Sequence, residues 1–201
     1  LQWEAGSDDG EDTPQSLSYN LRIGRTSTGH DVLSGVIGLG LGNAGSNLSY
    51  RVNDLESGTY FWSAQTIDDG FARSEWSDAG TFVIDTVAPE MQDVNLSRSQ
   101  LGIGQTATLA LNIFDEHIGV DATVEPAVEA VGENGRYPLS RLQFTGSAWS
   151  GELTVDEEVP SGAYSIQVSG IADAKGNVMP TFIAENALTV DTDRPTVVDS
   201  S

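Results

Sequence analysis

Two segments of this 201-residue chain carry the same pattern. Residues 55–69 and residues 159–173 each hold an apolar residue, then Ser-Gly, then a tyrosine, and then apolar residues at nearly every second position. The two tyrosines, Tyr60 and Tyr164, are 104 residues apart. Alternation with a period of two predicts a β-strand with one buried face. The Ser-Gly before it predicts a turn that leads into that strand.

A second repeat marks where each unit ends. Ile84-Asp85-Thr86 precedes Pro89, and Val190-Asp191-Thr192 precedes Pro195, 106 residues later. A strand that ends in Asp-Thr and is followed by proline is typical of a linker, and a repeat at this period indicates tandem modules. We therefore expect one domain over residues 1–86 and a second over 87–191. Residues 192–201 are then a linker or the start of a next module.

The rest of the chain predicts short strands rather than helices. Glycine is frequent, with 22 residues, and helical periodicity is hard to find, which favours many strands and turns. In the first domain we expect strands at 1–5, 17–24, 32–37, 47–52, 59–67 and 80–85. In the second we expect them at 90–97, 106–114, 123–131, 139–145, 148–155, 163–171 and 187–190. This number and spacing fit two stacked sheets, so the predicted fold is all-β, with two tandem antiparallel β-sandwich domains.

The first domain opens directly on a predicted strand, residues 1–5. A sandwich of this kind usually has a strand before it, so we expect this domain to lack its first strand. The sequence leaves open whether that strand is absent or supplied by another chain. An unpaired sheet edge there could recruit the tail of a neighbouring molecule, residues 196–201.

Composition narrows the function classes. The chain has no cysteine, which excludes disulfides, and no apolar run of about 18 residues, which argues against a membrane-spanning helix. Its net charge is −21, with 30 acidic residues against 9 basic ones. Such a surface repels nucleic acid and anionic membranes. It is compatible with divalent cations, with a salty habitat, or simply with solubility.

The first domain resembles fibronectin type III modules. The resemblance rests on Trp3, on residues 19–23, on Leu55-Glu-Ser-Gly-Thr-Tyr60, and on Ser74-Glu-Trp76-Ser77 before the last strand. The segment that ends at Tyr60 is similar to the family's tyrosine corner, although it is one residue shorter and has serine in place of proline.

The second domain resembles bacterial immunoglobulin-like repeats. The residues that carry this resemblance are Asp85-Thr-Val-Ala-Pro89, residues 114–119 and Asp173-Ala-Lys-Gly176-Asn177. Together the two resemblances imply a piece of a large bacterial protein that is secreted or lies at the cell surface. They imply a non-catalytic spacer whose partners are neighbouring domains of the same polypeptide. The alternative is a carbohydrate- or protein-binding adhesion module that accompanies a secreted enzyme.

The sharpest candidate site is a Ca²⁺ site. In the implied topology, the loop after the second strand, the loop before the last strand and the incoming linker share one end of the second domain. The residues brought together are Asp85, Asp115, Glu116, Asp173 and Asn177. Carboxylate, amide and carbonyl oxygens are the ligands that Ca²⁺ prefers. Asp and Asn also favour turns for reasons of their own, so ordinary loops are the competing interpretation.

A second acidic cluster is expected at the outer end of the first domain. It combines residues 8–12, which hold four carboxylates, with Asp68 and Asp69. The spacing does not fit an EF-hand, and a solvated loop is favoured over a metal site.

Exposed tryptophans would indicate a glycan site. Trp3 and Trp62 occupy inward positions and are predicted core residues. Trp76 and Trp149 are the candidates for ligand binding, and Trp149, flanked by small and polar residues, is the one expected to be exposed.

Catalysis has little support in the sequence. The two histidines, His30 and His117, lie in different predicted domains, and no nucleophile elbow is present. The glycines of residues 36–42 lack the strand-to-helix context and the lysine of a phosphate-binding loop. We therefore expect that the protein is not an enzyme.

Overall fold

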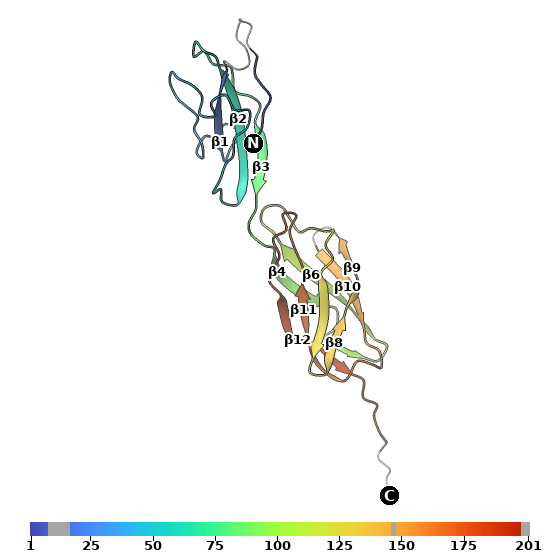
Figure 1. The fold of residues 1–201 in the computed structure, drawn as a ribbon. Coiled ribbons are helices and arrows are strands. Elements are labelled where there is room, and N and C mark those ends of the chain that lie inside the picture. The colour runs from blue at the N-terminus through green and yellow to red at the C-terminus, as the bar shows by residue number, and fades with distance from the viewer. Residues whose placement is uncertain (8–16, 146–147, 198–201) are drawn as a thin grey trace. The chain divides into compact units, whose positions relative to one another are not determined.

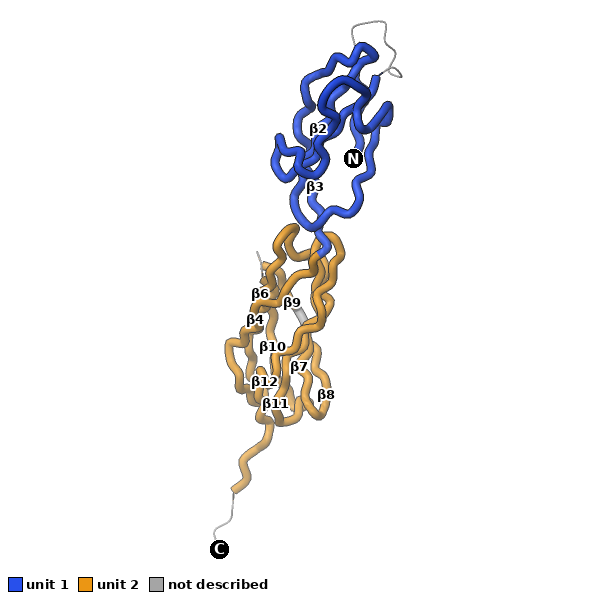
Figure 2. The backbone as a smooth tube through the Cα atoms, turned by 90° about the vertical axis from the view of Figure 1, so that its left-hand side faces the viewer, with its two compact units in different colours: residues 1–86 blue, residues 87–201 orange. Residues whose placement is uncertain are grey.

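A computed structural model of the chain describes residues 1–7, 17–145 and 148–197 (Figure 1). The described residues contain strands and turns but no helix, which confirms the all-β prediction. The chain divides into two compact units, Leu1–Thr86 and Val87–Ser201 (Figure 2).

The first unit is built on one three-stranded antiparallel sheet of order β1-β2-β3. The strands are β1 (Ser18–Gly24), β2 (Gly58–Ile67) and β3 (Gly80–Ile84). Two small groups of buried side chains lie against it, and Trp3 and Tyr50 pack against both. One group contains Leu17, Tyr19 and Ala44, and the other contains Leu21, Ile23 and Tyr60.

The outer edge of β1 is covered by side-chain amides instead of a full strand. Asn43 accepts a hydrogen bond from the Leu21 N–H at 2.7 Å and donates one to the Leu21 carbonyl at 2.8 Å. Asn20 makes the same kind of exchange with the backbone of Val36. Gly42 crosses so close to β1 that a Cβ atom there would lie 2.0 Å from the Tyr19 carbonyl oxygen. The chain can pass this close to β1 at residue 42 only because this position has no side chain.

Three of the strands predicted for the first unit are not regular strands. Residues 1–5 and 47–52 meet in one isolated bridge, Gln2 with Ser49, and residues 32–37 form one bridge, Leu33 with Ile23. The prediction was wrong there because irregular loops and the two asparagine amides replace the expected backbone ladder.

The second unit is a sandwich of two sheets. The first sheet has the order β4-β6-β10-β9, and the second has the order β5-β12-β11-β7-β8. Every pairing is antiparallel except that of β5 with β12, which is parallel. The strands are β4 (Glu90–Leu96), β5 (Gln100–Gly102), β6 (Thr106–Phe114), β7 (Ala127–Gly132), β8 (Gly135–Pro138), β9 (Ser140–Thr145), β10 (Ala148–Thr154), β11 (Gly162–Ser169) and β12 (Phe182–Asp191).

One continuous core fills the space between these two sheets. Buried and exposed residues alternate along β6, and the same alternation runs through β11. This is the pattern of strands with one face inward. Leu109 and Leu111 from β6 and Ile166 and Val168 from β11 are fully buried in the same cluster.

The sequence repeat corresponds to one hydrogen-bonding arrangement that occurs in both units. The Tyr60 hydroxyl donates to the Glu56 carbonyl at 2.9 Å, and the Tyr164 hydroxyl donates to the Pro160 carbonyl at 2.8 Å. In each case the acceptor lies four residues earlier in the chain. Burial raises the pKa of the Tyr164 phenol, which keeps it in the protonated form that donates this bond.

In each unit, the serine of the Ser-Gly before the tyrosine also bonds to the backbone just after the last strand. Ser57 Oγ accepts the Thr86 N–H at 3.0 Å, and Ser161 Oγ accepts the Thr192 N–H at 2.8 Å. The following glycines, at positions 58 and 162, have φ values of 152° and 155°. The repeat around the tyrosines and the repeat around Asp-Thr therefore belong to a single structural motif, which occurs once in each unit.

Candidate functional site

Asp173 is the most deeply buried carboxylate of the predicted metal-site residues. It is 1% exposed. Its Oδ1 accepts the N–H groups of Lys175 and Asn177 at 2.7 and 3.0 Å, and its Oδ2 accepts the Asn177 side-chain amide at 2.6 Å. Burial alone would raise the pKa of Asp173, but the hydrogen bonds from this loop lower it below its ordinary value. The group is therefore a carboxylate at neutral pH.

Asp115 follows β6 and organises the next loop in a similar way. Its Oδ1 accepts three consecutive backbone N–H groups, from His117, Ile118 and Gly119, at 3.2, 2.9 and 2.7 Å. This is the turn-forming use of aspartate that the sequence left open as an alternative. One oxygen of each side chain, Asp115 Oδ1 and Asp173 Oδ1, is thus committed mainly to its own loop.

Backbone contacts hold these two loops of the second unit together. Val120 forms an antiparallel bridge with Asp173, and the Asp121 N–H donates to the Ala172 carbonyl at 2.9 Å. The 171–179 loop closes on itself through Met179 N–H to the Ile171 carbonyl at 2.8 Å. The positions of Asp115 and Asp173 are therefore fixed by the fold of the unit itself.

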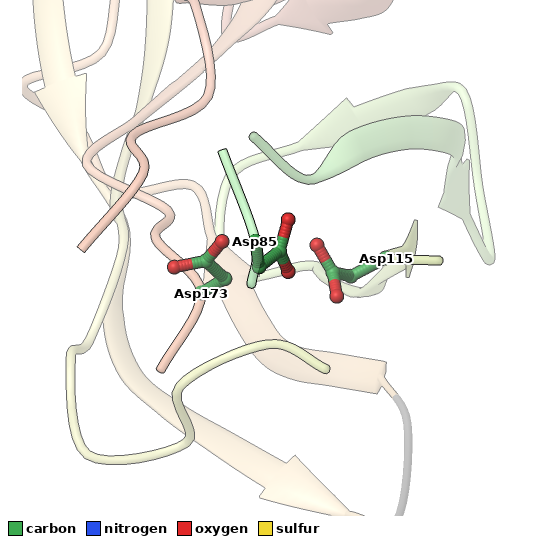
Figure 3. Close-up of side chains that lie close together, drawn as sticks. All are labelled: Asp85, Asp115 and Asp173. Atoms are coloured by element: carbon green, nitrogen blue, oxygen red, sulfur yellow. The ribbon is translucent and has the colours of Figure 1, made fainter. Parts of the chain in front are cut away.

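Asp85, which directly follows β3 in the chain, supplies a third carboxylate. One side-chain oxygen from each of Asp85, Asp115 and Asp173 lies within 4.8 Å of the others (Figure 3). Asp85 is 8% exposed and Asp115 is half-buried. In the described part of the chain, no lysine, arginine or histidine forms an ion pair with Asp115 or Asp173.

This geometry suits a divalent cation. Carboxylates this close, in partly buried surroundings, repel one another. Ca²⁺ binds oxygens at about 2.3–2.6 Å, so two ligands of one ion lie at most about 5 Å apart. The three oxygens meet that limit, and a bound cation would remove the repulsion.

The other two predicted ligands have different positions. The Glu116 side chain is exposed and does not belong to the group of three close carboxylates. Asn177 lies beside the group, with its amide nitrogen donating to Asp173. It therefore supports Asp173 in this structure. Direct ligation of a cation by Asn177 stays a prediction, whereas Glu116 lies outside the group of close carboxylates.

The second acidic cluster falls largely outside the described residues, because residues 8–12 are not among them. Of the other two residues of this cluster, Asp68 and Asp69, Asp68 accepts the Ala72 N–H at 2.7 Å and so shapes its own turn.

The prediction that Trp149 is exposed was wrong. Trp149 is 4% exposed and packs on Phe144, with ring centroids 5.3 Å apart, inside the core of the second unit. Its small and polar neighbours lie on β10, where the alternation of the strand sends the large ring inward. A ring buried in this way has no face on which a sugar could stack.

Trp76 is half-buried, and its ring lies beneath the Arg22 guanidinium, 4.5 Å from the ring centroid. It lines a shallow hollow together with Trp3 and Trp62, which are also half-buried. The sequence reasoning missed this hollow, because it assigned Trp3 and Trp62 wholly to the core. The spacing of Trp3 and Trp62 in the sequence does not indicate that their rings line the same hollow.

No described helix is long and apolar enough to cross a membrane.

Comparisons with known proteins give little beyond this geometry. No protein-family model matches the chain, and no curated protein matches it. Among solved structures, the chain is similar to the Bacteroides ovatus mixed-linkage glucan utilization locus protein SGBP-B, in complex with a mixed-linkage heptasaccharide. The identity is 17% and the TM-score 0.27, over 88% of this chain and 38% of that one. A likeness at this level carries no argument about function.

Proposed function

We propose that the chain is a pair of non-catalytic β-sandwich modules from a larger extracellular bacterial protein, and that Ca²⁺ binds at Asp85, Asp115 and Asp173. The modules act as a spacer for neighbouring domains of the same polypeptide. The cation ties the linker residue Asp85 to the two loops of the second unit and so restrains the linker.

The observation that carries this proposal is the mutual approach of three carboxylates within 4.8 Å. Two features support it. Hydrogen bonds and a backbone bridge within the second unit hold the loops of Asp115 and Asp173 in place. The pKa of Asp173 is lowered by its own loop, so a charged ligand is already present at neutral pH. A site whose ligands are held in place in advance loses less conformational entropy on binding.

Thermal unfolding of the 201-residue chain tests the proposal. The chain is unfolded in Ca²⁺, in Mg²⁺ and in EDTA. A ligand that binds only the folded state stabilises it by about 2.7 kcal/mol at a concentration about 100 times its dissociation constant. For a unit of this size we expect a rise of roughly 10 °C in the midpoint of the second unit, selective for Ca²⁺.

Two Asp→Asn variants sharpen the test. The amide oxygen that Asp115→Asn introduces can still accept the three loop N–H groups, so this substitution removes charge but keeps the turn. In EDTA this variant should be as stable as the wild type or slightly more stable, and in Ca²⁺ it should lose most of the rise. Asp121→Asn is the matched control, because among the described residues the Asp121 side chain bonds to Thr123 alone and lies outside the group. Equal shifts for wild type, Asp115→Asn and Asp121→Asn would contradict the proposal.

A further inference from the structure

Residues 36–42 of the first unit expose large apolar side chains beside an open hollow. Ile37 is 87% exposed and Leu39 is 88% exposed. Both border a hollow of about 590 Å³, whose other walls come from Ser34, Val36, Gly38, Gln65, Phe71, Arg73 and Trp76. This apolar hollow is separate from the one that Trp3 and Trp62 line, although Trp76 borders both. Exposed apolar side chains that gather around a hollow are typical of an interaction site.

Hydrogen bonds hold the backbone that presents Ile37 and Leu39. Asn20 accepts the Val36 N–H at 2.7 Å and donates to the Val36 carbonyl at 3.2 Å. The Arg73 guanidinium donates to the Val36 carbonyl at 2.8 Å and also to the Gly38 carbonyl. Ile37 lies between the two residues held in this way, and Leu39 directly follows them. A surface that is ordered in advance loses less conformational entropy when a ligand binds.

Another wall of the apolar hollow is a phenylalanine in a strained conformation. Phe71 has a φ value of 65° and is 41% exposed. This left-handed conformation is unfavourable for a bulky residue. Two bonds to Asp68 impose it, because the Phe71 N–H donates to the Asp68 carbonyl at 3.2 Å and the Ala72 N–H donates to the Asp68 carboxylate at 2.7 Å. Among the described residues, Phe71 belongs to neither buried cluster of the unit. Core packing therefore does not explain the strain, which indicates a functional role for the ring.

The polar groups in the walls already bond to the chain itself. Gln65 Nε2 donates to the Ser74 carbonyl at 2.8 Å, and Ser34 Oγ donates to the Gly35 carbonyl at 3.1 Å. Arg73 donates to the two carbonyls of the 36–42 segment. The hydroxyl groups of a sugar would need hydrogen-bond partners on leaving water. The apolar hollow therefore fits an apolar side chain better than a sugar.

The charge around these walls is negative. Segment 68–78 supplies Phe71 and Trp76 to the hollow and has one basic residue, Arg73, against four acidic ones. The acidic residues are Asp68, Asp69, Glu75 and Asp78, of which the last three are exposed. The whole chain has a net charge of −21. A partner with positive charge is attracted to this surface, whereas an anionic membrane or a second copy of the chain is repelled.

We propose that the apolar hollow docks a partner protein, which places one large apolar side chain against Ile37, Leu39 and Phe71 and carries lysine or arginine beside it. Burial of the three exposed side chains supplies the affinity, and the surrounding carboxylates favour a basic partner over other apolar surfaces. The docking site uses none of the three aspartates of the proposed calcium site, so it adds a binding role to that of a spacer.

The test uses peptides selected from a random phage library on the immobilised 201-residue chain. The binding of each selected peptide to the chain in solution is then measured by fluorescence polarisation. The expected peptides share one large apolar residue flanked by lysine or arginine, and salt should weaken their binding because it screens exposed charges. Neutral phosphatidylcholine vesicles, mixed with the chain and sedimented, should leave it in solution.

Serine variants of the exposed side chains locate the binding. Ile37→Ser and Leu39→Ser should each weaken peptide binding at least about tenfold. Ile183→Ser is the matched control, because Ile183 is an exposed isoleucine of the second unit, and it should change binding less than about threefold. Since all three side chains are exposed, the unfolding midpoints should stay close to that of the wild type.

Variants of Phe71 separate binding from folding. Asparagine tolerates the left-handed conformation better than phenylalanine, so Phe71→Asn should unfold at the same temperature as the wild type or a higher one. It should nevertheless weaken peptide binding at least about tenfold. Phe71→Tyr keeps the ring and should bind within about threefold of the wild type. A ring with a structural role alone would lose stability in Phe71→Asn and leave peptide binding to the folded protein unchanged.

Three results would overturn the proposal. The first is a library that yields no specific peptide, and the second is a set of peptides that bind Ile37→Ser and Phe71→Asn as tightly as the wild type. The third is binding to neutral vesicles, or a dimer in sedimentation velocity, that Leu39→Ser abolishes. The third result would assign the hollow to a lipid surface or to a second copy of the chain. None of these measurements involves Ca²⁺, so their outcome is separate from that of the metal-site test.

Discussion

The two units share one structural motif but enclose their cores in different ways. Both have a tyrosine hydroxyl bonded to a carbonyl four residues earlier, and both have a serine that accepts the N–H of the threonine after the last strand. In the second unit, two sheets surround one continuous core. In the first, a single three-stranded sheet is completed by irregular segments over two small clusters.

The difference shows that the shared motif is specified by short stretches of sequence, whereas the enclosure of a core depends on pairing between distant segments. The tyrosine motif depends on residues close together in the chain and on one strand pair, so the same short pattern produces it in both units. Enclosure of a core depends on whether distant segments form full ladders. In the second unit alternating strands do so, whereas in the first the glycines and asparagines of residues 35–47 take other hydrogen bonds.

The largest effect is expected from truncating the core of the second unit. Leu111 is fully buried in the cluster between the two sheets. Leu111→Ala should destabilise that unit by about 2–5 kcal/mol, through lost burial and the cavity left behind. Chemical denaturation, followed by Trp149 fluorescence in a background with Trp3, Trp62 and Trp76 replaced by phenylalanine, measures it. An effect under about 1 kcal/mol would mean that this core is not closely packed.

A smaller and nearly equal effect is expected from the two tyrosines. Tyr60→Phe and Tyr164→Phe each remove one hydroxyl and leave a carbonyl acceptor without its bond. Each should cost its own unit about 1 kcal/mol. Unfolding curves of the two variants can be compared directly. A loss of stability in only one of the two variants would show that the same hydrogen-bond geometry does not contribute the same free energy in both units.

The pH dependence of the second unit tests the state of Asp173. Because the folded pKa of Asp173 lies below its ordinary value of 3.8, its stabilising contribution is complete above the unfolded pKa and is lost as pH falls through the folded one. In EDTA, the stability difference between wild type and Asp173→Asn should be constant above about pH 5 and shrink progressively below about pH 4. A difference that stays constant down to about pH 2 would contradict the lowered pKa.

The smallest effect is expected where the first unit exposes large apolar side chains. Leu39 is 88% exposed in the 36–42 segment, whereas Leu111 in the second unit is buried. Leu39→Ser should change stability by less than about 0.5 kcal/mol. Measured beside Leu111→Ala, it gives the contrast between the two regions for the same residue type. A loss above about 1 kcal/mol would show that this leucine is covered in solution.

Much of the strand pattern could be predicted, and the exceptions have physical reasons. The predicted strand at 106–114 coincides with β6, and that at 148–155 ends one residue beyond β10, because both alternate with a clear period of two. β5 and β8, of three and four residues, were missed. Strands this short are defined by their partners, β12 and β7, and not by a pattern of their own.

The candidate site could be predicted in part. Asp85, Asp115 and Asp173 were predicted together and lie together, although the presence of a metal remains a proposal. Glu116 was expected among them but lies outside the group, because sequence does not fix which of two adjacent side chains turns inward at a loop. For Trp149, the small and polar neighbours suggested an exposed ring. The alternation of side chains along β10 instead directs this ring into the core.

The central proposal, a calcium site at Asp85, Asp115 and Asp173, is tested most directly by isothermal titration with Ca²⁺ of the metal-free chain and of Asp85→Asn, Asp115→Asn and Asp121→Asn. We expect one ion per chain at this site, weakened at least about tenfold in the first two variants and unchanged in the third. An absence of binding in the wild type, or binding that Asp85→Asn and Asp115→Asn leave unchanged, would contradict the proposal. The acidity of the three residues would then be a property of their loops alone.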